Sequence, residues 1–228
     1  MKFYMKNLTL LIPARKEKES LPLVINEIKN LDCKKKVILT SDDVDTIDAI
    51  KNLNVDIIYQ DRRGYGDALI TGINSVDTDY FCIFNADGSF NPNELEKMMS
   101  KINSENLDFI FASRYEKNSK SDDDTILTYI GNKIFTLIGK IFFKLNITDI
   151  LYTFVLGRAD KAKNLNLTSF DFRFCVELPI KANKQNMKLG TINSHERKRI
   201  AGKKKVNEIK DGFLILSYLV VLFFKKII

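Results

Sequence analysis

Short apolar segments alternate with helical patterns along the first half of the chain, and no other feature restricts its fold as strongly. Each apolar segment has the length of a strand, and they lie at residues 8–12, 37–39, 55–59, 80–84 and 107–112. Between them, apolar residues recur at helical spacing, as at Leu21, Val24, Ile25 and Ile28. Strands separated by helices predict a mainly parallel sheet flanked by helices on both faces. The chain is therefore predicted to be an α/β protein.

The length and composition fit one core rather than two equal domains. Of the 228 residues, 45% are hydrophobic, which is enough for one sizeable core. We expect one domain over residues 1–212 and an apolar helix over residues 213–228. The polar stretch 117–124 lacks apolar periodicity and is expected to be an exposed loop. The sequence gives no indication of an oligomeric state.

The strand at 80–84 ends in the polar turn Asn85-Ala86-Asp87. In an open α/β sheet, ligands bind at the carboxyl ends of the strands. Carboxylate and amide oxygens at such a strand end are suited to hold Mg²⁺ or Mn²⁺ against phosphate oxygens. A turn that only ends the strand has the same composition, so both interpretations stay open. Under the first, Asp87 and Asn85 are the metal ligands.

The positive charge of the chain is concentrated near its C-terminus. Residues 1–180 contain 24 Lys and Arg and 26 Asp and Glu, whereas residues 181–228 contain 12 and 3. Such a basic region favours a polyanion or an anionic membrane surface as partner, although a solvated face has the same composition. Nucleic acid is not expected, because the basic residues are not interleaved with aromatic ones and no binding module is recognisable.

Two apolar segments are flanked by lysines. Residues 126–145 are apolar on most sides, and residues 213–224 are followed by Lys225 and Lys226. The longest uncharged run within 126–145 and the whole of 213–224 are both shorter than the roughly 20 residues that cross a bilayer, which favours helices lying in the membrane surface. Packing in the core is the alternative for 126–145, and docking on another surface is the alternative for the C-terminal helix.

The cysteines and the N-terminus bear on the compartment. Cys33, Cys82 and Cys175 are odd in number and far apart, which disfavours a disulfide framework and a cysteine zinc site. The first residues lack the long apolar segment of a signal peptide. We therefore expect a cytoplasmic protein, bound peripherally to the cytoplasmic face of a membrane.

Seven short motifs follow one another along the chain, at residues 11–19, 64–72, 85–87, 113–115, 149–154, 174–178 and 196–206. The first three resemble the P-x-x-N-E opening, the G-x-G-x-A-x-x-x-G helix start and the D-x-D of family-2 glycosyltransferases. The other four resemble the S-R-Y, D-x-x-S-G-F, F-x-x-E-L and R-x-x-G-x-S-K blocks of the polyprenol- or dolichol-phosphate mannosyl- and glucosyltransferase branch. Their order over nearly the whole chain makes the resemblance specific.

The resemblance implies a Rossmann-like GT-A fold, a divalent cation, and transfer of a hexose with inversion from a nucleoside-diphosphate sugar to polyprenyl phosphate. It also places the nucleotide against residues at the carboxyl ends of the first strands and at the next helix start, which are Pro13, Ala14, Arg15, Glu17, Asp42, Gly64, Gly66 and Asp67. For Asp42, N-capping of the following helix is an equally good interpretation.

The same resemblance assigns the remaining candidate residues. Asp87, Asn85 and Ala86 are implied at the cation and diphosphate, and a basic lid over them contains Arg197, Arg199, Lys203 and Lys205. Arg114 is implied at the acceptor phosphate, with Asp149 and Glu177 placing the sugar or the lid. Asp87, Asp149 and Arg199 are the candidate catalytic residues. His195, the only histidine, is expected to be structural.

The chain differs from the family pattern at four positions. Lys16, Asn85, Thr153 and Lys204 stand where the family has Asn, the first Asp of D-x-D, Gly and Ser. Asn85 keeps an oxygen ligand without its charge, so cation binding is expected to be weak. Two alternatives follow: a transferase acting on a saccharide hydroxyl, which requires a carboxylate base, and a degenerate homologue that binds nucleotide or lipid without turnover.

Overall fold

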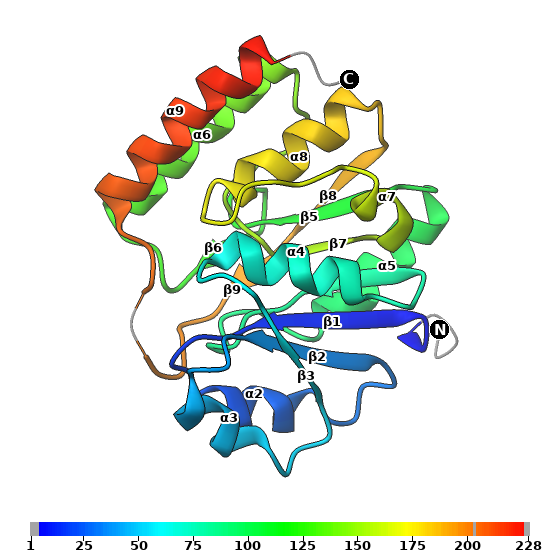
Figure 1. The fold of residues 1–228 in the computed structure, drawn as a ribbon. Coiled ribbons are helices and arrows are strands. Elements are labelled where there is room, and N and C mark those ends of the chain that lie inside the picture. The colour runs from blue at the N-terminus through cyan, green and yellow to red at the C-terminus, as the bar shows by residue number, and fades with distance from the viewer. Residues whose placement is uncertain (1–4, 203, 226–228) are drawn as a thin grey trace.

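The structure is a computed structural model that describes residues 5–202 and 204–225 (Figure 1). Within these ranges one sheet of seven strands has the order β3-β2-β1-β4-β7-β5-β8. Its strands are β1 (Leu8–Pro13), β2 (Lys34–Leu39), β3 (Asp56–Tyr59), β4 (Tyr80–Ile83), β5 (Phe109–Ser113), β7 (Val155–Arg158) and β8 (Leu189–Asn193). Only β7 runs antiparallel to its neighbours, β4 and β5. The predicted mainly parallel sheet is confirmed.

Helices cover both faces of this sheet, as the alternating pattern predicts. Their bounds are α2 (Leu21–Glu27), α3 (Val44–Ile50), α4 (Tyr65–Ser75), α5 (Glu94–Ser104), α6 (Ile126–Phe143), α7 (Ala159–Lys163), α8 (Phe174–Lys184) and α9 (Glu208–Phe224). Neighbouring residues of a strand point to opposite faces. On β1, Leu10 therefore packs in the cluster with α2, α3 and α5, whereas Leu11 packs in the cluster with α4 and α6 to α9.

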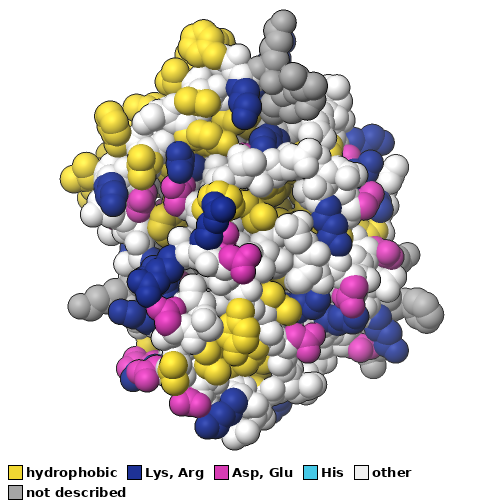
Figure 2. Space-filling model, viewed as in Figure 1, with side chains coloured by type: hydrophobic (Ala, Val, Ile, Leu, Met, Phe, Trp, Pro, Cys, Tyr) yellow, Lys and Arg dark blue, Asp and Glu magenta, His cyan; other side chains and the backbone are white. Residues whose placement is uncertain are grey.

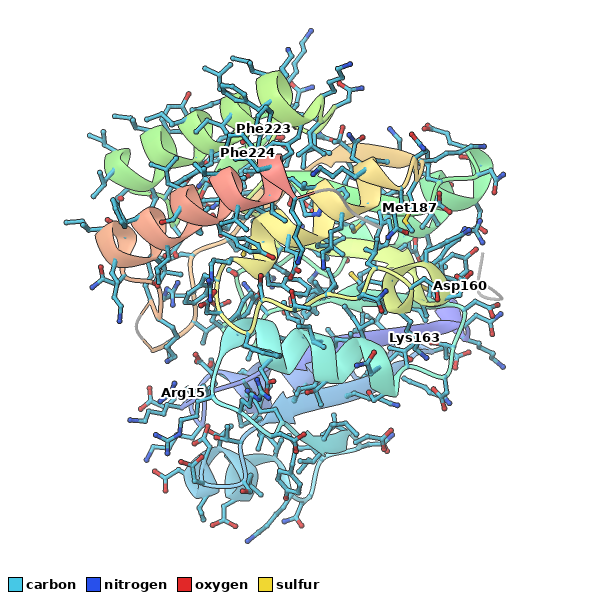
Figure 3. The ribbon with its side chains drawn as sticks, turned by 45° about the horizontal axis from the view of Figure 1, so that its top comes forward. Arg15, Asp160, Lys163, Met187, Phe223 and Phe224 are labelled. Atoms are coloured by element: carbon cyan, nitrogen blue, oxygen red, sulfur yellow. The ribbon has the colours of Figure 1, made fainter. Side chains whose placement is uncertain are left out.

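The two apolar segments form a pair of helices, α6 and α9, on the outside of the helices α4, α7 and α8 that cover one face of the sheet. α6 and α9 lie side by side, and their last turns meet where Phe223 contacts Phe142 and Phe143 with ring centroids 5.8 and 6.2 Å apart (Figures 1 and 3). α9 begins at Glu208, so the predicted boundary between residues 212 and 213 falls within it. Its inner side chains Ile215, Leu219 and Leu222 are buried. The C-terminal helix is thus also part of the core.

The outer faces of the same helices remain apolar and exposed. On α6 the exposed side chains are Ile126, Leu127, Tyr129, Ile130, Ile134, Leu137, Ile141 and Phe142, and on α9 they are Ile209, Phe213, Leu216, Val220, Val221, Phe223 and Phe224. Figure 2 shows hydrophobic side chains gathered over this part of the molecule. Among the described helices, α6 alone is long and apolar enough to cross a membrane by length and composition, and 17% of it is buried.

The composition of 117–124 predicts an exposed loop, but part of this stretch forms a strand. Lys120 and Ser121 form β6, which pairs in parallel with β9 (His195–Glu196). The two segments are about 75 residues apart in sequence, and no local pattern announces such a pairing. This small sheet ties the stretch before α6 to the basic segment before α9.

Candidate functional site

A cleft of about 620 Å³ opens at the carboxyl ends of β1 and β4. Residues from all seven predicted motifs line it, including Arg15, Gly64, Asp87, Arg114 and Arg199. Arg15 lies at the side of the molecule on which α9 begins (Figure 3). The cleft continues from these strand ends to the first turns of α6 and α9. The strand-end position of the site follows the rule for open α/β sheets.

The turn after β4 places Asn85 and Asp87 in the cleft. Asp87 Oδ1 accepts a hydrogen bond from the backbone N–H of Ser89 at 3.0 Å, which fixes the carboxylate. The amide nitrogen of Asn85 donates to Ser89 Oγ at 3.3 Å, which leaves the amide oxygen out of this contact. Asp87 Oδ2 lies 3.7 Å from Arg199 and is therefore beyond hydrogen-bond distance of it. One oxygen from each side chain remains to meet a ligand.

These two oxygens suit a cation only if the ligand supplies more. Among residues 5–202 and 204–225, no group of three or more His, Cys, Asp or Glu side chains is placed to hold a metal ion. Mg²⁺ is commonly held by one or two carboxylates together with substrate phosphates and water. Asp87 and Asn85 fit that pattern. Asn85 adds no charge to the pair.

A basic segment, residues 197–202 and 204–206, covers the Asp87 turn. The backbone N–H groups of Arg197 and Ile200 donate to the carbonyls of Ser89 and Asp87, both at 2.8 Å. Gly88 has a φ of 83°, and a Cβ there would lie 2.4 Å from Ile200 Cδ1. Glycine is therefore needed at this position, because a side chain would strain the turn and push the segment away.

Acidic side chains hold the cations of this segment. Arg199 donates to Asp123 Oδ2 at 3.0 Å, and Lys204 donates to the Asp123 carbonyl at 2.8 Å. Lys205 lies 3.1 Å from Glu17, whose other oxygen accepts from Ser20 at 2.8 Å. Glu17 is thus placed against the basic segment in this state. Because these contacts occupy Arg199, Lys204 and Lys205, an anion entering the cleft would compete with Asp123 and Glu17 for them.

Arg114 lies among three carboxylates. Asp149 binds it through Nε at 2.7 Å and Nη2 at 3.1 Å, and Nη1 lies 3.3 Å from Asp124 and 3.2 Å from Glu196. The Arg114 guanidinium is therefore already compensated, which weakens its expected role at a phosphate. Asp149 is fully buried and lies outside the lining of the cleft, so it positions Arg114 rather than facing a ligand.

Asp123, Asp124 and Glu196 line the cleft but are absent from the candidates that the sequence suggests. Asp123 and Asp124 precede α6, and Glu196 belongs to β9. Burial raises the pKa of Glu196, and this outweighs the lowering by Arg114 and by the hydrogen bond from Ser121. The polar composition of 117–124 gives no sign of this role, because only the β6–β9 pairing brings these carboxylates to the cleft.

Several predicted site residues lie outside the cleft lining, and each has a structural partner. Asp42 pairs with Arg63 at the surface, and Asp67 accepts from the backbone N–H of Arg62 at 3.0 Å. Arg197 binds Glu27 through two hydrogen bonds of 2.7 and 3.0 Å and so anchors the basic segment to α2. Lys203 lies outside the described residues.

Glu177 and the glycines of the second motif meet at one loop. Glu177 is fully buried and accepts hydrogen bonds from the backbone N–H groups of Thr168 and Ser169. Burial acts to raise its pKa, but Lys181 and these donors outweigh it, so the pKa is lowered. A Cβ on Gly64 or Gly66 would lie 2.0 Å from a carbonyl oxygen of the same loop. These glycines allow the loop to approach α4, and Gly64 also lines the cleft.

Comparison with known proteins assigns the family. The profile named Glycosyl transferase family 2 matches residues 9–165, which is more than half of the chain. The chain belongs to glycosyl transferase family 2. A curated relative is the low-salt glycan biosynthesis hexosyltransferase Agl6 of Haloferax volcanii, which is 22% identical over 168 residues. The match covers 72% of this chain and 40% of that relative.

Solved structures of the same architecture confirm the predicted GT-A fold. Glucosyl-3-phosphoglycerate synthase of Mycobacterium tuberculosis, in complex with Mn²⁺, UDP and glucosyl-3-phosphoglycerate, has a TM-score of 0.76 and 12% identity. The similarity covers 97% of this chain and 81% of that one. The same enzyme with Mg²⁺ and UDP has a TM-score of 0.71 and 11% identity, covering 97% and 80% of the two chains. At such identities the likeness concerns the fold.

Proposed function

We propose that this family-2 member transfers a hexose, with inversion, from a nucleoside-diphosphate sugar to polyprenyl phosphate at the cytoplasmic face of a membrane. The observation that carries the proposal is the course of the cleft. It runs from the Asp87 turn to Thr128 and Asn132 on α6 and to Glu208, Lys210, Asp211 and Ile215 on α9. Both helices expose apolar faces. A lipid-borne acceptor at a membrane surface can therefore reach the donor without leaving that surface.

The residues of the cleft divide the chemistry between them. Asp87 and Asn85 would hold Mg²⁺ or Mn²⁺, which neutralises the diphosphate as its charge grows. Arg199 and Lys204 are placed to add positive charge at the same group, which is where electrostatic stabilisation acts in such a transfer. The complex of the mycobacterial synthase with Mn²⁺ and UDP-glucose supports a divalent cation and a nucleotide-sugar donor.

An ionised phosphate acceptor needs no base, because its oxygen is already a nucleophile. Arg114 is compensated by its three carboxylates. Lys210 lines the cleft from the first turn of α9 and makes no ion pair with another described residue. We assign the acceptor phosphate to Lys210, next to the apolar faces, because a lysine there can pair with phosphate without giving up a partner.

The test is a transfer assay with separated acceptors. The purified chain is incubated with UDP-glucose, UDP-N-acetylglucosamine or GDP-mannose plus short-chain polyprenyl phosphate or an oligosaccharide, and products are identified by mass spectrometry. We expect a polyprenyl-phosphate hexose from one donor. Transfer only to the oligosaccharide would overturn the acceptor assignment, and binding of nucleotide without any transfer would indicate the degenerate homologue.

A saccharide hydroxyl acceptor is the second candidate, and one observation favours it. Glu196 lines the cleft with a raised pKa and lies beside Asp124, as suits a general base for a hydroxyl. In the mycobacterial synthase, the complex holds glucosyl-3-phosphoglycerate, which is a product of transfer to a hydroxyl-bearing acid. The oligosaccharide arm of the same assay decides between the two acceptors.

Replacing Arg199 with Ala is expected to lower the rate of transfer about 100-fold and to weaken binding of the free nucleoside diphosphate much less. The reason is that its charge acts mainly as the diphosphate departs. Single-turnover rates and calorimetric affinities measure the two effects. The matched control is Lys198→Ala, an exposed cation of the same segment outside the cleft lining. Equal losses in rate and affinity would instead make Arg199 a static phosphate clamp.

The membrane part of the proposal predicts that Phe213→Gln combined with Phe224→Gln reduces flotation with anionic liposomes by at least about 10-fold, because both side chains lose their apolar burial in lipid. These side chains are 72% and 77% exposed. Substitution is preferable to deletion of 213–228, which would remove Ile215, Leu219 and Leu222 from the core. The control is Leu23→Gln, which changes an exposed apolar side chain on α2. Equal flotation of all variants would contradict the assignment.

A further inference from the structure

One polar side chain of α6 faces the cleft without a partner. Asn132 is 5% exposed and lines the cleft. Its amide oxygen is buried and accepts no hydrogen bond from any described residue. Asparagine is also a weak helix former, and the other buried residues of α6 are Gly139 and Phe143. Neither helix propensity nor packing explains an amide at this position.

The polar residues one turn away on either side behave differently. Thr128 Oγ1 accepts from the backbone N–H of Thr125 at 2.8 Å and completes the capping box of α6. Thr136 Oγ1 accepts from the backbone N–H of Ile150 at 3.2 Å. Residues four apart share a helix face. Thr128 and Thr136 therefore have hydrogen-bond partners within the chain, whereas the amide oxygen of Asn132, which lies between them, is left for a ligand.

The unpartnered atom restricts what the ligand can be. Burying an acceptor without a donor is unfavourable, so a ligand at Asn132 must offer an O–H or N–H group. An ionised phosphate has acceptors only, and a polyprenyl chain has neither. A sugar hydroxyl both donates and accepts, and an amide side chain can pair with it in both senses.

We propose that Asn132 is a sugar-specificity residue whose amide binds a hydroxyl of the hexose in the cleft. The inference deepens the proposed function and rests on it, because it takes the donor's hexose as the ligand. The cleft that holds the Asp87 turn at the strand ends also contains Asn132 on α6. The diphosphate of the donor joins two hydroxyl-bearing groups, the ribose and the hexose, and because the free diphosphate keeps only the ribose, comparing the two ligands separates them.

The experiment compares Asn132→Leu with the unaltered chain by calorimetry. The affinities for UDP-glucose, UDP-N-acetylglucosamine and GDP-mannose are each compared with the affinity for the corresponding free diphosphate, UDP or GDP. We expect the variant to lose about 10-fold in affinity for the nucleotide sugar that binds and none for its free diphosphate. Leu keeps the volume of the side chain and removes the unpaired amide, so the unliganded variant should unfold at the same or a higher temperature. The control is Thr136→Val, which removes a hydroxyl from the same helix face outside the cleft lining.

Monodeoxy analogues of the donor identify the hydroxyl. One analogue should bind the unaltered chain more weakly than its parent, whereas the variant should not distinguish the two. If the variant binds donor as well as the unaltered chain but its KM for an oligosaccharide acceptor rises, the hexose at Asn132 belongs to the acceptor. Unchanged donor affinity and unchanged KM overturn the inference while the proposed function stands. Failure of all three nucleotide sugars to bind the unaltered chain overturns both.

Discussion

Replacing Asp87 with Asn is expected to reduce transfer about 1,000-fold and to leave the fold intact. Asp87 is the only charged member of the Asn85-Ala86-Asp87 turn, so the substitution removes the one negative charge that this turn offers a cation. The hydrogen bond from the Ser89 N–H to Oδ1 can persist with an amide, which preserves the turn. Initial rates over a range of Mn²⁺ and Mg²⁺ concentrations measure the loss of transfer, and circular dichroism of the variant checks that the fold is intact.

The reciprocal variant is the control for the same site. Asn85→Asp adds a carboxylate beside Asp87 and should lower the Mn²⁺ concentration needed for half-maximal rate, because a second charge strengthens cation binding. Full activity of Asp87→Asn at low cation concentration would contradict the assignment of this turn. A loss of activity together with a loss of ellipticity would show that Asp87 serves the fold.

Replacing Asp149 with Ala is expected to destabilise the fold by about 3 kcal/mol, the lower end of the range for removing one partner of a buried ion pair. Asp149 is fully buried and meets Arg114 through both oxygens. Asp124 and Glu196 still compensate part of the Arg114 charge, which keeps the loss at the lower end. Urea unfolding followed by circular dichroism measures the free energy.

The control for this prediction is Asp61→Ala, which removes an exposed carboxylate and should leave the urea midpoint unchanged. Asp149→Asn keeps two polar atoms for Arg114 and should recover part of the lost stability. If Asp149→Ala is as stable as the unaltered chain but inactive, Asp149 acts on a substrate directly, and the catalytic role that its motif suggests would hold.

The sequence by itself determined the mainly parallel sheet with its flanking helices and the strand-end turn that lies in the candidate cleft. Alternating apolar strands and helices predict the sheet because periodicity is a local property, which each segment displays without its neighbours. The Asn85-Ala86-Asp87 turn is recognisable for the same reason, since it follows its strand directly. The strands β7 and β8 were not predicted, and the antiparallel pairing of β7 with β4 and β5 joins distant segments that no local pattern announces.

The tertiary structure alone decided which charges meet. Arg114 and the basic segment look alike in sequence as phosphate ligands, but Asp149, Asp124 and Glu196 compensate Arg114, whereas Arg199 reaches the Asp87 turn. In the sequence, Asn132 is only a polar residue within an apolar helix, and the structure shows that it lines the cleft. These roles depend on contacts between segments tens of residues apart, such as β6 and β9. Such contacts are set by how the sheet brings its loops together, and no local pattern of residues encodes them.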